Sequence, residues 1–274
     1  MNGETVLSLA IGGTRLVLDL AALPVARRDA VHARYAAFAA RPDPGAAIAV
    51  QVRLRGGRPF LPWDARTPLP LVTRRIGARL VFVAPQEAGW LDPATRQARL
   101  VLRGQGTVEN FLRVVTAWSA LEQGGLLLHA CGVVRGGRAF VFFGASGVGK
   151  STVAGLSRAW TVLSDDLVLV EPAATGYEAG GVPFRGSAWD APRVNARAPL
   201  AGLYALRQAP AHALRDLPLA EATARLAASA PFVAQCATAA TALLATCAGL
   251  AGQVPVRELS FCRDGLFWEV IDGR

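Results

Sequence analysis

The segment from Gly144 to Thr152, which reads GASGVGKST, constrains this chain more than any other. It follows the apolar run from Phe140 to Phe143 and matches GxxxxGK[ST], a pattern in which a strand enters a glycine-rich loop and a helix leaves it. Backbone N–H groups of such a loop surround a phosphate, and the lysine reaches the terminal phosphates. The sequence therefore predicts a site for ATP and Mg²⁺ formed by Gly144, Ala145, Ser146, Gly147, Val148, Gly149, Lys150, Ser151 and Thr152.

The lysine of this pattern stands out in the composition. The chain has 29 Lys and Arg residues, and Lys150 is the only lysine among them. A compact ammonium with three donors fits beneath phosphates where a planar guanidinium does not. Retention of lysine at this one position supports a phosphate-binding role for it.

Net charge and arginine distribution argue against a nucleic-acid partner. The formal charge of +9 suits anionic ligands, but the arginines are scattered and occur at most in pairs such as Arg27-Arg28. Nucleic-acid binding proteins instead gather basic residues into a stripe or patch. We therefore expect small anionic ligands and no nucleic acid.

The cysteines and the apolar segments indicate a cytoplasmic protein without a membrane anchor. Cys131, Cys236, Cys247 and Cys262 show no CxxC spacing, which predicts reduced, buried thiols and no metal site. The N-terminus lacks the basic region of a signal peptide. An uncharged helix expected over 232–250 contains Thr among its Ala and precedes further strands, so we expect it to pack within the protein.

Periodicity and turn residues predict a mixed α/β fold in two domains, a small β-rich N-terminal module over 1–106 and a catalytic domain over 107–274. In the module, Asp29–Phe38 is expected to be a helix and Arg55–Leu71 mostly loop, and no element is assigned to Pro85–Thr95 between two expected strands. In the second domain, Thr107 is expected to cap a helix, Pro172–Ala198 to be a loop, and Arg135-Gly136-Gly137 to close a hairpin that leads into the glycine-rich loop. Strands are expected at 6–10, 15–20, 47–54, 78–83, 98–103, 126–134, 138–143, 162–170, 199–207, 254–262 and 266–271, the last two as a hairpin.

Two adjacent carboxylates follow the glycine-rich segment. Asp165 and Asp166 lie within the apolar run VLSDDLVLV, where buried negative charge is costly unless a cation compensates it. Mg²⁺ with a nucleotide is such compensation. His129 lies on the strand that is expected to pair with the strand before the glycine-rich loop. This position is compatible with a histidine packed in the core and with a catalytic histidine. Arg185 and Arg193 are weaker candidates for contacting phosphate or an anionic substrate.

Together, LLLHACGVVRGGRAFVFFGASGVGKST and VLSDDLVLV resemble the C-terminal catalytic domain of HPr kinase/phosphorylase. The resemblance covers about Leu126 to Leu206 and implies a fold related to phosphoenolpyruvate carboxykinases. It implies that Asp165 is the base toward the acceptor hydroxyl, that Asp166 and Ser151 bind the metal, and that His129 tunes the aspartate. The segment Pro183-Phe184-Arg185-Gly186 lacks the family's glutamate, so the resemblance does not extend to phosphorolysis.

The resulting expectation is an ATP-dependent kinase that acts on a serine of a peptide or protein, as small relatives of that family in lasso-peptide and other modified-peptide pathways do. One alternative is a kinase for a small hydroxyl metabolite. Another is a nucleotide-gated peptide-binding module or a regulatory ATPase without transfer, and a homo-oligomer is compatible with each. A preference for ATP over GTP or pyrophosphate does not follow from the sequence.

Overall fold

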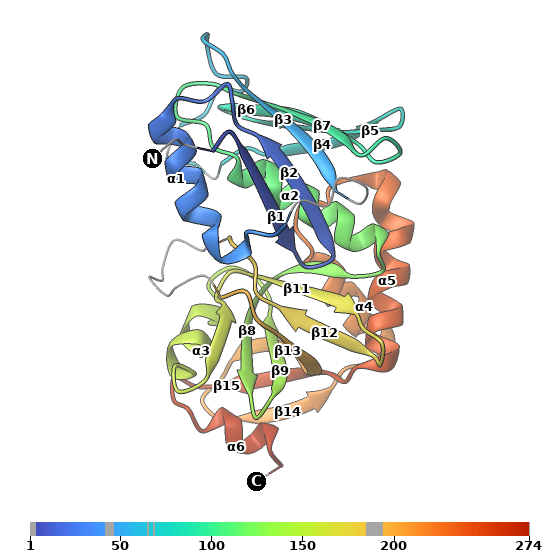
Figure 1. Ribbon diagram of the computed structural model, residues 1–274. Coiled ribbons are helices and arrows are strands. Elements are labelled where there is room, and N and C mark those ends of the chain that lie inside the picture. Colours follow the sequence, from blue (N-terminus) through green and yellow to red (C-terminus); the bar gives the residue numbers. More distant parts are fainter. Residues whose placement is uncertain (1–3, 42–46, 65, 68, 185–193, 274) are drawn as a thin grey trace. The chain divides into compact units, whose positions relative to one another are not determined.

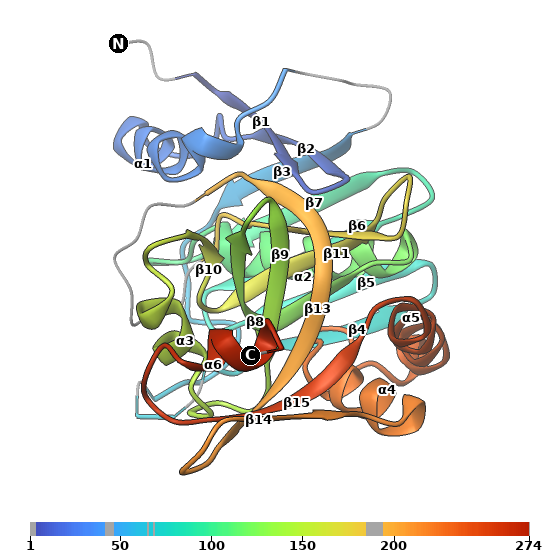
Figure 2. The same ribbon diagram turned by 90° about the horizontal axis from the view of Figure 1, so that it is seen from below.

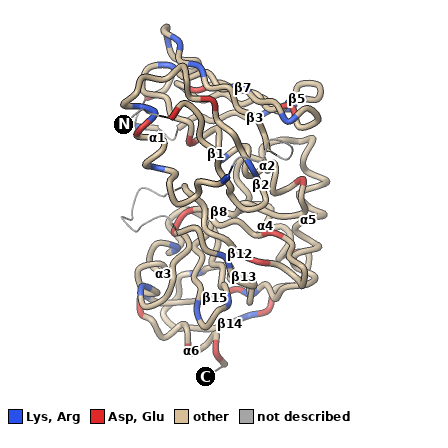
Figure 3. Tube along the Cα trace, viewed as in Figure 1, with Lys and Arg blue, Asp and Glu red and all other residues tan. Residues whose placement is uncertain are grey.

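A computed structural model describes residues 4–41, 47–64, 66–67, 69–184 and 194–273 of the chain. The chain forms two compact units, Met1–Ser119 with Gln235–Thr238 and Ala120–Ala234 with Ala239–Arg274. One sheet has seven strands and the other has eight, and both mix parallel and antiparallel pairs (Figure 1). The predicted mixed α/β class is confirmed. Lys and Arg are dispersed along the trace of both units (Figure 3).

The sheet of the first unit has the strand order β1-β2-β3-β7-β6-β5-β4. Its strands and helices are β1 (Val6–Ile11), β2 (Thr14–Asp19), α1 (Val25–Tyr35), the 3₁₀ turn η1 (Ala36–Phe38), β3 (Ile48–Leu54), β4 (Val72–Ile76), β5 (Arg79–Ala84), β6 (Glu87–Asp92) and β7 (Gln97–Leu102). Alternate residues of β1, namely Leu7, Leu9 and Ile11, are buried, as expected for a strand with one face on a core. The five strands predicted here are confirmed.

Two strands of this sheet were not predicted. β6 lies in the segment Pro85–Thr95, to which the sequence assigns no element, and β4 follows a stretch rich in Pro and Gly. β6 has few β-branched residues, but it pairs with β5 on one edge and β7 on the other, and these ladders satisfy its backbone.

The helix α2 (Glu109–Glu122) contains the point at which the chain passes from the first unit to the second. The hydroxyl Oγ1 of Thr107 accepts a hydrogen bond from the backbone N–H of Glu109 at 3.3 Å. The predicted helix and its capping residue are thus confirmed.

The second unit holds the eight-stranded sheet. Its elements are β8 (Leu126–Arg135), β9 (Arg138–Phe143), α3 (Lys150–Leu156), β10 (Thr161–Ser164), β11 (Leu167–Pro172), β12 (Tyr177–Gly180), β13 (Arg197–Gln208), β14 (Ala213–Asp216), α4 (Leu219–Ala228), α5 (Ala240–Gln253), β15 (Val256–Phe261) and α6 (Phe267–Ile271). The 3₁₀ turn η2 (Ala237–Ala239) crosses the boundary between the units. The pairs β8–β9, β9–β13, β13–β12, β12–β11 and β11–β8 return to their starting strand. These strands therefore form a closed ring of pairings.

The hairpin β8–β9 leads directly into the glycine-rich loop, as predicted. Gly136 and Gly137 form its two-residue turn with φ of 56° and 73°, and Arg135 pairs with Arg138 across it. Positive φ at both turn positions matches the right-handed twist of the flanking strands. β9 is antiparallel to β8 but parallel to β13, and β13 is parallel to β15 (Figure 2). The carboxyl ends of β9, β13 and β15 consequently share one edge of the sheet.

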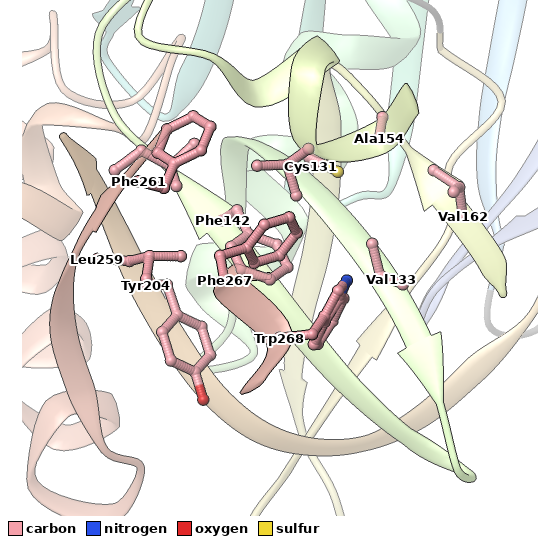
Figure 4. Packing of buried hydrophobic residues seen from close by; sticks show 12 residues of the cluster. Cys131, Val133, Phe142, Ala154, Val162, Tyr204, Leu259, Phe261, Phe267 and Trp268 are labelled. Atoms are coloured by element: carbon pink, nitrogen blue, oxygen red, sulfur yellow. The ribbon is translucent and has the colours of Figure 1, made fainter. Parts of the chain in front are cut away.

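An aromatic cluster fills the core of this unit (Figure 4). The ring of Phe142 lies 5.3 Å from that of Tyr204, 5.9 Å from that of Phe267 and 5.6 Å from that of Trp268, measured between centroids. Phe267 and Trp268 belong to α6, so the strand predicted over 266–271 is wrong. This apolar run is short enough to suit either structure, and burial of both rings against Phe142 favours the helix.

Three other expectations of this region need correction. The segment Pro172–Ala198 contains β12 among its described residues and was expected to be a loop. The helix after the glycine-rich loop, which the sequence predicts to reach about Trp160, ends at Leu156 as α3. The helix expected over 232–250 begins only at Ala240 and continues to Gln253. Within the described residues, none of the helices has the length and apolar character needed to span a membrane.

Candidate functional site

The glycine-rich loop leaves β9 at Gly144 and enters α3 at Lys150. Gly144, Gly147 and Gly149 have φ of 145°, 78° and 121°. A Cβ on Gly149 would lie 2.4 Å from Cζ of Phe261, whose side chain is buried beneath the loop. The conformation of the loop and the close approach of β15 therefore both require glycine at position 149.

We expect Gly149→Ala to lower the free energy of unfolding by about 2–6 kcal/mol, because backbone strain and overpacking of a core each cost roughly 1–3 kcal/mol. Gly147→Ala is the matched control. Gly147 also has a positive φ, but apart from its chain neighbours none of the described residues has an atom within 4 Å of the position its Cβ would take. Urea unfolding followed by tryptophan fluorescence measures both variants, and equal losses would exclude the contact with Phe261 as a cause.

The side chain of Lys150 is 6% exposed and lies beneath the loop. Its Nζ donates hydrogen bonds to the carbonyl oxygens of Gly144 and Ala145, both at 2.9 Å. Burial lowers the pKa of Lys150, and the negative charge of Asp166 opposes this shift. None of the ion pairs found among the described residues includes Lys150. The loop thus holds a buried cation whose hydrogen-bond acceptors are neutral carbonyls.

The two predicted carboxylates occupy a break between β10 and β11, both of which pair with β8. At this break Oγ of Ser164 accepts hydrogen bonds from the backbone N–H groups of Asp166 and Leu167, each at 3.2 Å. Asp165 is 5% exposed, whereas the side chain of Asp166 is 23% exposed. The single strand predicted over 162–170 is therefore wrong, because the polar pair interrupts it.

The strand register brings this break close to the start of the glycine-rich loop. Ala130 of β8 pairs with Phe143, the last residue of β9, and its N–H donates to the carbonyl of Asp166 at 3.0 Å. Neighbouring strands lie about 5 Å apart, so Asp166 and Phe143 are separated by about two strand spacings. Asp165 and Lys150 both act electrostatically on the buried thiol of Cys131. The loop and the carboxylates thus belong to one region of the sheet.

His129 lies beside the second carboxylate. Its Nε2 is 3.6 Å from Oδ1 of Asp166, and its backbone N–H donates to the carbonyl of Ser229 at 2.7 Å. The imidazole is 39% exposed, so it is not enclosed in a core. The pair is positioned to exchange a proton or to share a ligand.

A cavity of about 480 Å³ opens beside the loop. Its described lining comes from the loop, from β8, β9 and β13, and from the end of α4, and comprises His129, Phe143, Gly144, Ala145, Ser146, Val148, Ala205, Leu206, Arg225, Ala228 and Ser229. Lys150, Asp165 and Asp166 are not among these lining residues. Ser151 is exposed and Thr152 half-buried in the first turn of α3. Arg185 and Arg193 lie outside the described residues.

Arg225 and Ser229 are cavity residues that sequence reasoning missed. Arg225 forms ion pairs with Glu221 at 2.6 Å and Glu258 at 2.8 Å, which hold its guanidinium at the wall of the cavity. The sequence places Arg225 in an amphipathic helix about 75 residues after the loop, with no motif around it. β14 runs antiparallel to β15, and the carbonyl of Ser229, just after α4, accepts a hydrogen bond from the backbone N–H of His129 in β8.

The comparisons with known proteins correct the family expected from the motifs. Residues 100–273 match the family model described as SynChlorMet cassette protein ScmC. The assignment to HPr kinase/phosphorylase is therefore wrong, because it rested on a short loop signature and an acidic pair that do not by themselves distinguish one family from another. A search of curated proteins finds no match. Because the matched segment covers well over half of the chain, this protein belongs to the SynChlorMet cassette protein ScmC family.

Proposed function

We propose that this protein is an ATP-dependent phosphotransferase and that Gly144–Gly149 is its phosphate-binding loop. The proposal depends most on Lys150, a buried ammonium at the junction of a glycine-rich loop and a helix, with only carbonyl acceptors at 2.9 Å. A buried cation destabilises a protein unless an anion compensates it. The terminal phosphates of a nucleotide would supply that anion, and the adjoining cavity has room for part of a nucleotide.

The donor atoms near the loop suit Mg²⁺ accompanying the nucleotide. Ser151 offers an exposed hydroxyl, and Asp166 offers a partly exposed carboxylate that acts electrostatically on Lys150. Mg²⁺ prefers such oxygen ligands and is bound by one or two side chains together with substrate phosphates. When bound, Mg²⁺–ATP would supply a transferable phosphoryl group with its charge partly neutralised.

The chain's own residues then take distinct roles. Lys150 binds the terminal phosphates, and Ser151 and Asp166 hold the cation. Asp165, which is shielded from water, accepts the proton of the acceptor hydroxyl. His129 orients Asp166 through the contact at 3.6 Å. Phosphoryl transfer depends on positioning and charge neutralisation, which these residues would provide.

We take a serine of a peptide or protein as the acceptor to be tested first. The experiment incubates the full chain and Mg²⁺ with [γ-³²P]ATP and either serine-containing peptide pools or a panel of free amino acids and sugars. We expect label in an acceptor with the wild type and none with Lys150→Ala. Equal labelling by both proteins would overturn the proposal.

The two acceptor arms also separate the remaining functions. Label in the small molecules but not in the peptides identifies a metabolite kinase. Release of inorganic phosphate with no labelled acceptor identifies a regulatory ATPase. Peptide affinity that changes with ATP, with no phosphate transferred by the wild type, identifies a nucleotide-gated binding module, and either result contradicts phosphotransfer.

A further inference from the structure

A second group of reactive side chains lies outside the site described above. His212 lies in the turn between β13 and β14, and Cys262 and Asp264 lie in the turn between β15 and α6. One nitrogen, sulfur or oxygen atom of each lies within 4.8 Å of those of the other two. The three side chains therefore converge although about 50 residues separate the first from the others.

The contacts among them are short. Nε2 of His212 lies 2.7 Å from Oδ1 of Asp264 and 3.2 Å from Sγ of Cys262, and Sγ lies 3.2 Å from Oδ2 of Asp264. In tetrahedral zinc sites the metal–ligand distances of about 2.0–2.3 Å place ligand atoms a little over 3 Å apart. The three atoms are thus already near the separations that a tetrahedral metal ion requires.

We propose that His212, Cys262 and Asp264 form a binding site for a divalent transition-metal ion of the zinc class. The imidazole nitrogen, the thiolate sulfur and a carboxylate oxygen would supply three ligands, and water the fourth, because the side chain of Asp264 is 48% exposed. On binding, the proton of the Cys262 thiol, now donated to Asp264, leaves to solvent and a metal–sulfur bond forms.

The donor set distinguishes this ion from the Mg²⁺ proposed near the loop. Thiolate and imidazole ligands select zinc-like ions, whereas Mg²⁺ takes oxygen ligands. Nδ1 of His212 is buried and has no hydrogen-bond partner among the described residues, so the polar contacts of the ring are those of Nε2. The ring also lies 6.5 Å from that of Phe267, measured between centroids. Packing and Nε2 therefore hold the imidazole toward the other two ligands.

The site would join two segments that contact the glycine-rich loop. Gln208, four residues before His212, donates from Nε2 to the carbonyl of Gly147 at 3.0 Å. Phe261, which precedes Cys262, lies against Gly149. The backbone N–H of Ala209 donates to the carbonyl of Phe261 at 3.0 Å. A metal ion here would fix the two turns together and so stabilise the floor of the loop.

The test titrates the metal-free full chain with Co²⁺ and then Zn²⁺, without nucleotide and with excess Mg²⁺ present. The thiolate gives Co²⁺ a charge-transfer absorption in the near ultraviolet. We expect this band to saturate at one equivalent in the wild type and to disappear when Zn²⁺ is added. Asp264→Asn should weaken binding roughly tenfold or more, and Cys262→Ser should abolish the band.

Cys236→Ser is the control, because it removes another thiol whose Sγ lies 3.2 Å from the hydroxyl of Thr238, a partner that serine can keep. It should leave the band and its midpoint unchanged. Circular dichroism checks that each variant is folded. A wild type without the band would show that the three side chains form only a closed hydrogen-bonded ring. A midpoint that Asp264→Asn leaves unaltered would show that the metal is held without this carboxylate, and either result would overturn the proposed site.

Discussion

Replacement of Lys150 by methionine is expected to abolish nucleotide binding while leaving the stability of the nucleotide-free protein within about 1 kcal/mol of the wild type. Two effects on stability oppose each other. Burial lowers the pKa of Lys150, which means that the charged form is disfavoured in the folded state. Loss of the ammonium also leaves two carbonyls without their donor, at a net cost of about 1 kcal/mol for each hydrogen bond.

The pH dependence follows from the sign of that shift. Because the pKa of Lys150 is lower in the folded state than its ordinary value of 10.5, the unfolded chain binds more protons than the folded one between these two values. The contribution of Lys150 to the free energy of unfolding therefore rises with pH between the two pKa values. Below both values the ammonium is charged in the folded and unfolded states, and the full cost of burying its charge applies. Lys150→Met should remove this rise, which denaturant unfolding in alkaline buffers would measure.

Thermal unfolding with and without Mg²⁺–ATP measures the loss of binding. At a nucleotide concentration of 100 Kd the wild type should gain about 2.7 kcal/mol, or a Tm higher by roughly 5–10 °C. Lys150→Met should show no shift. Arg158→Met removes a positive charge from an exposed position just after α3 and should keep the full shift. A nucleotide-dependent shift retained in Lys150→Met would contradict the proposed role of the loop.

The parts of this site that the sequence predicts are those encoded by local rules. Gly136 and Gly137 specify a two-residue turn because few other residues adopt positive φ at both positions. The loop from Gly144 to Gly149 is likewise set by its glycines. Both features depend on residues adjacent in the chain, so their structure follows from residue type and spacing alone.

Features that depend on distant pairing were missed. β12 and β14 have four residues each, and they are strands because β11, β13 and β15 offer free edges. Similarly, α6 has an apolar pattern compatible with a strand, and its packing on the aromatic cluster makes it a helix. A local pattern does not contain these partners.

The contact of His212 with Cys262 is another feature that depends on pairing between distant strands. The absence of CxxC spacing predicts no metal site, but this rule detects only ligands that lie close together in the chain. The parallel pairing of β13 with β15 brings the turns after both strands to the same edge of the sheet. A histidine from one turn and a thiol and carboxylate from the other then meet, which no spacing rule detects.

The second large effect is expected at the adjacent carboxylates, where two isosteric substitutions should separate base from metal ligand. Asp165→Asn should keep Mg²⁺–ATP binding and lower the transfer rate by about 10²–10⁴-fold, the usual contribution of a general base. Asp166→Asn should weaken nucleotide binding in the presence of Mg²⁺ but not in its absence, because the amide is a poor replacement for a carboxylate ligand.

The structure gives physical reasons for this separation. Asp166 is the carboxylate that acts electrostatically on Lys150, and it is open enough to reach a cation. Asp165 is 5% exposed, and its charge acts on the buried Cys131. Amide replacement preserves the size of each side chain, so the change in charge and proton-accepting ability accounts for the difference between the variants.

Single-turnover transfer to the acceptor identified by labelling, together with the Tm shift by ATP with and without Mg²⁺, measures both effects. Asp216→Asn serves as the control, because Asp216 is 85% exposed and pairs with Arg257 at 2.8 Å outside the cavity lining. It should change neither quantity. Transfer by Asp165→Asn at the wild-type rate would remove Asp165 as the base. If Mg²⁺ strengthens ATP binding to Asp166→Asn as much as to the wild type, Asp166 is not a ligand of the cation.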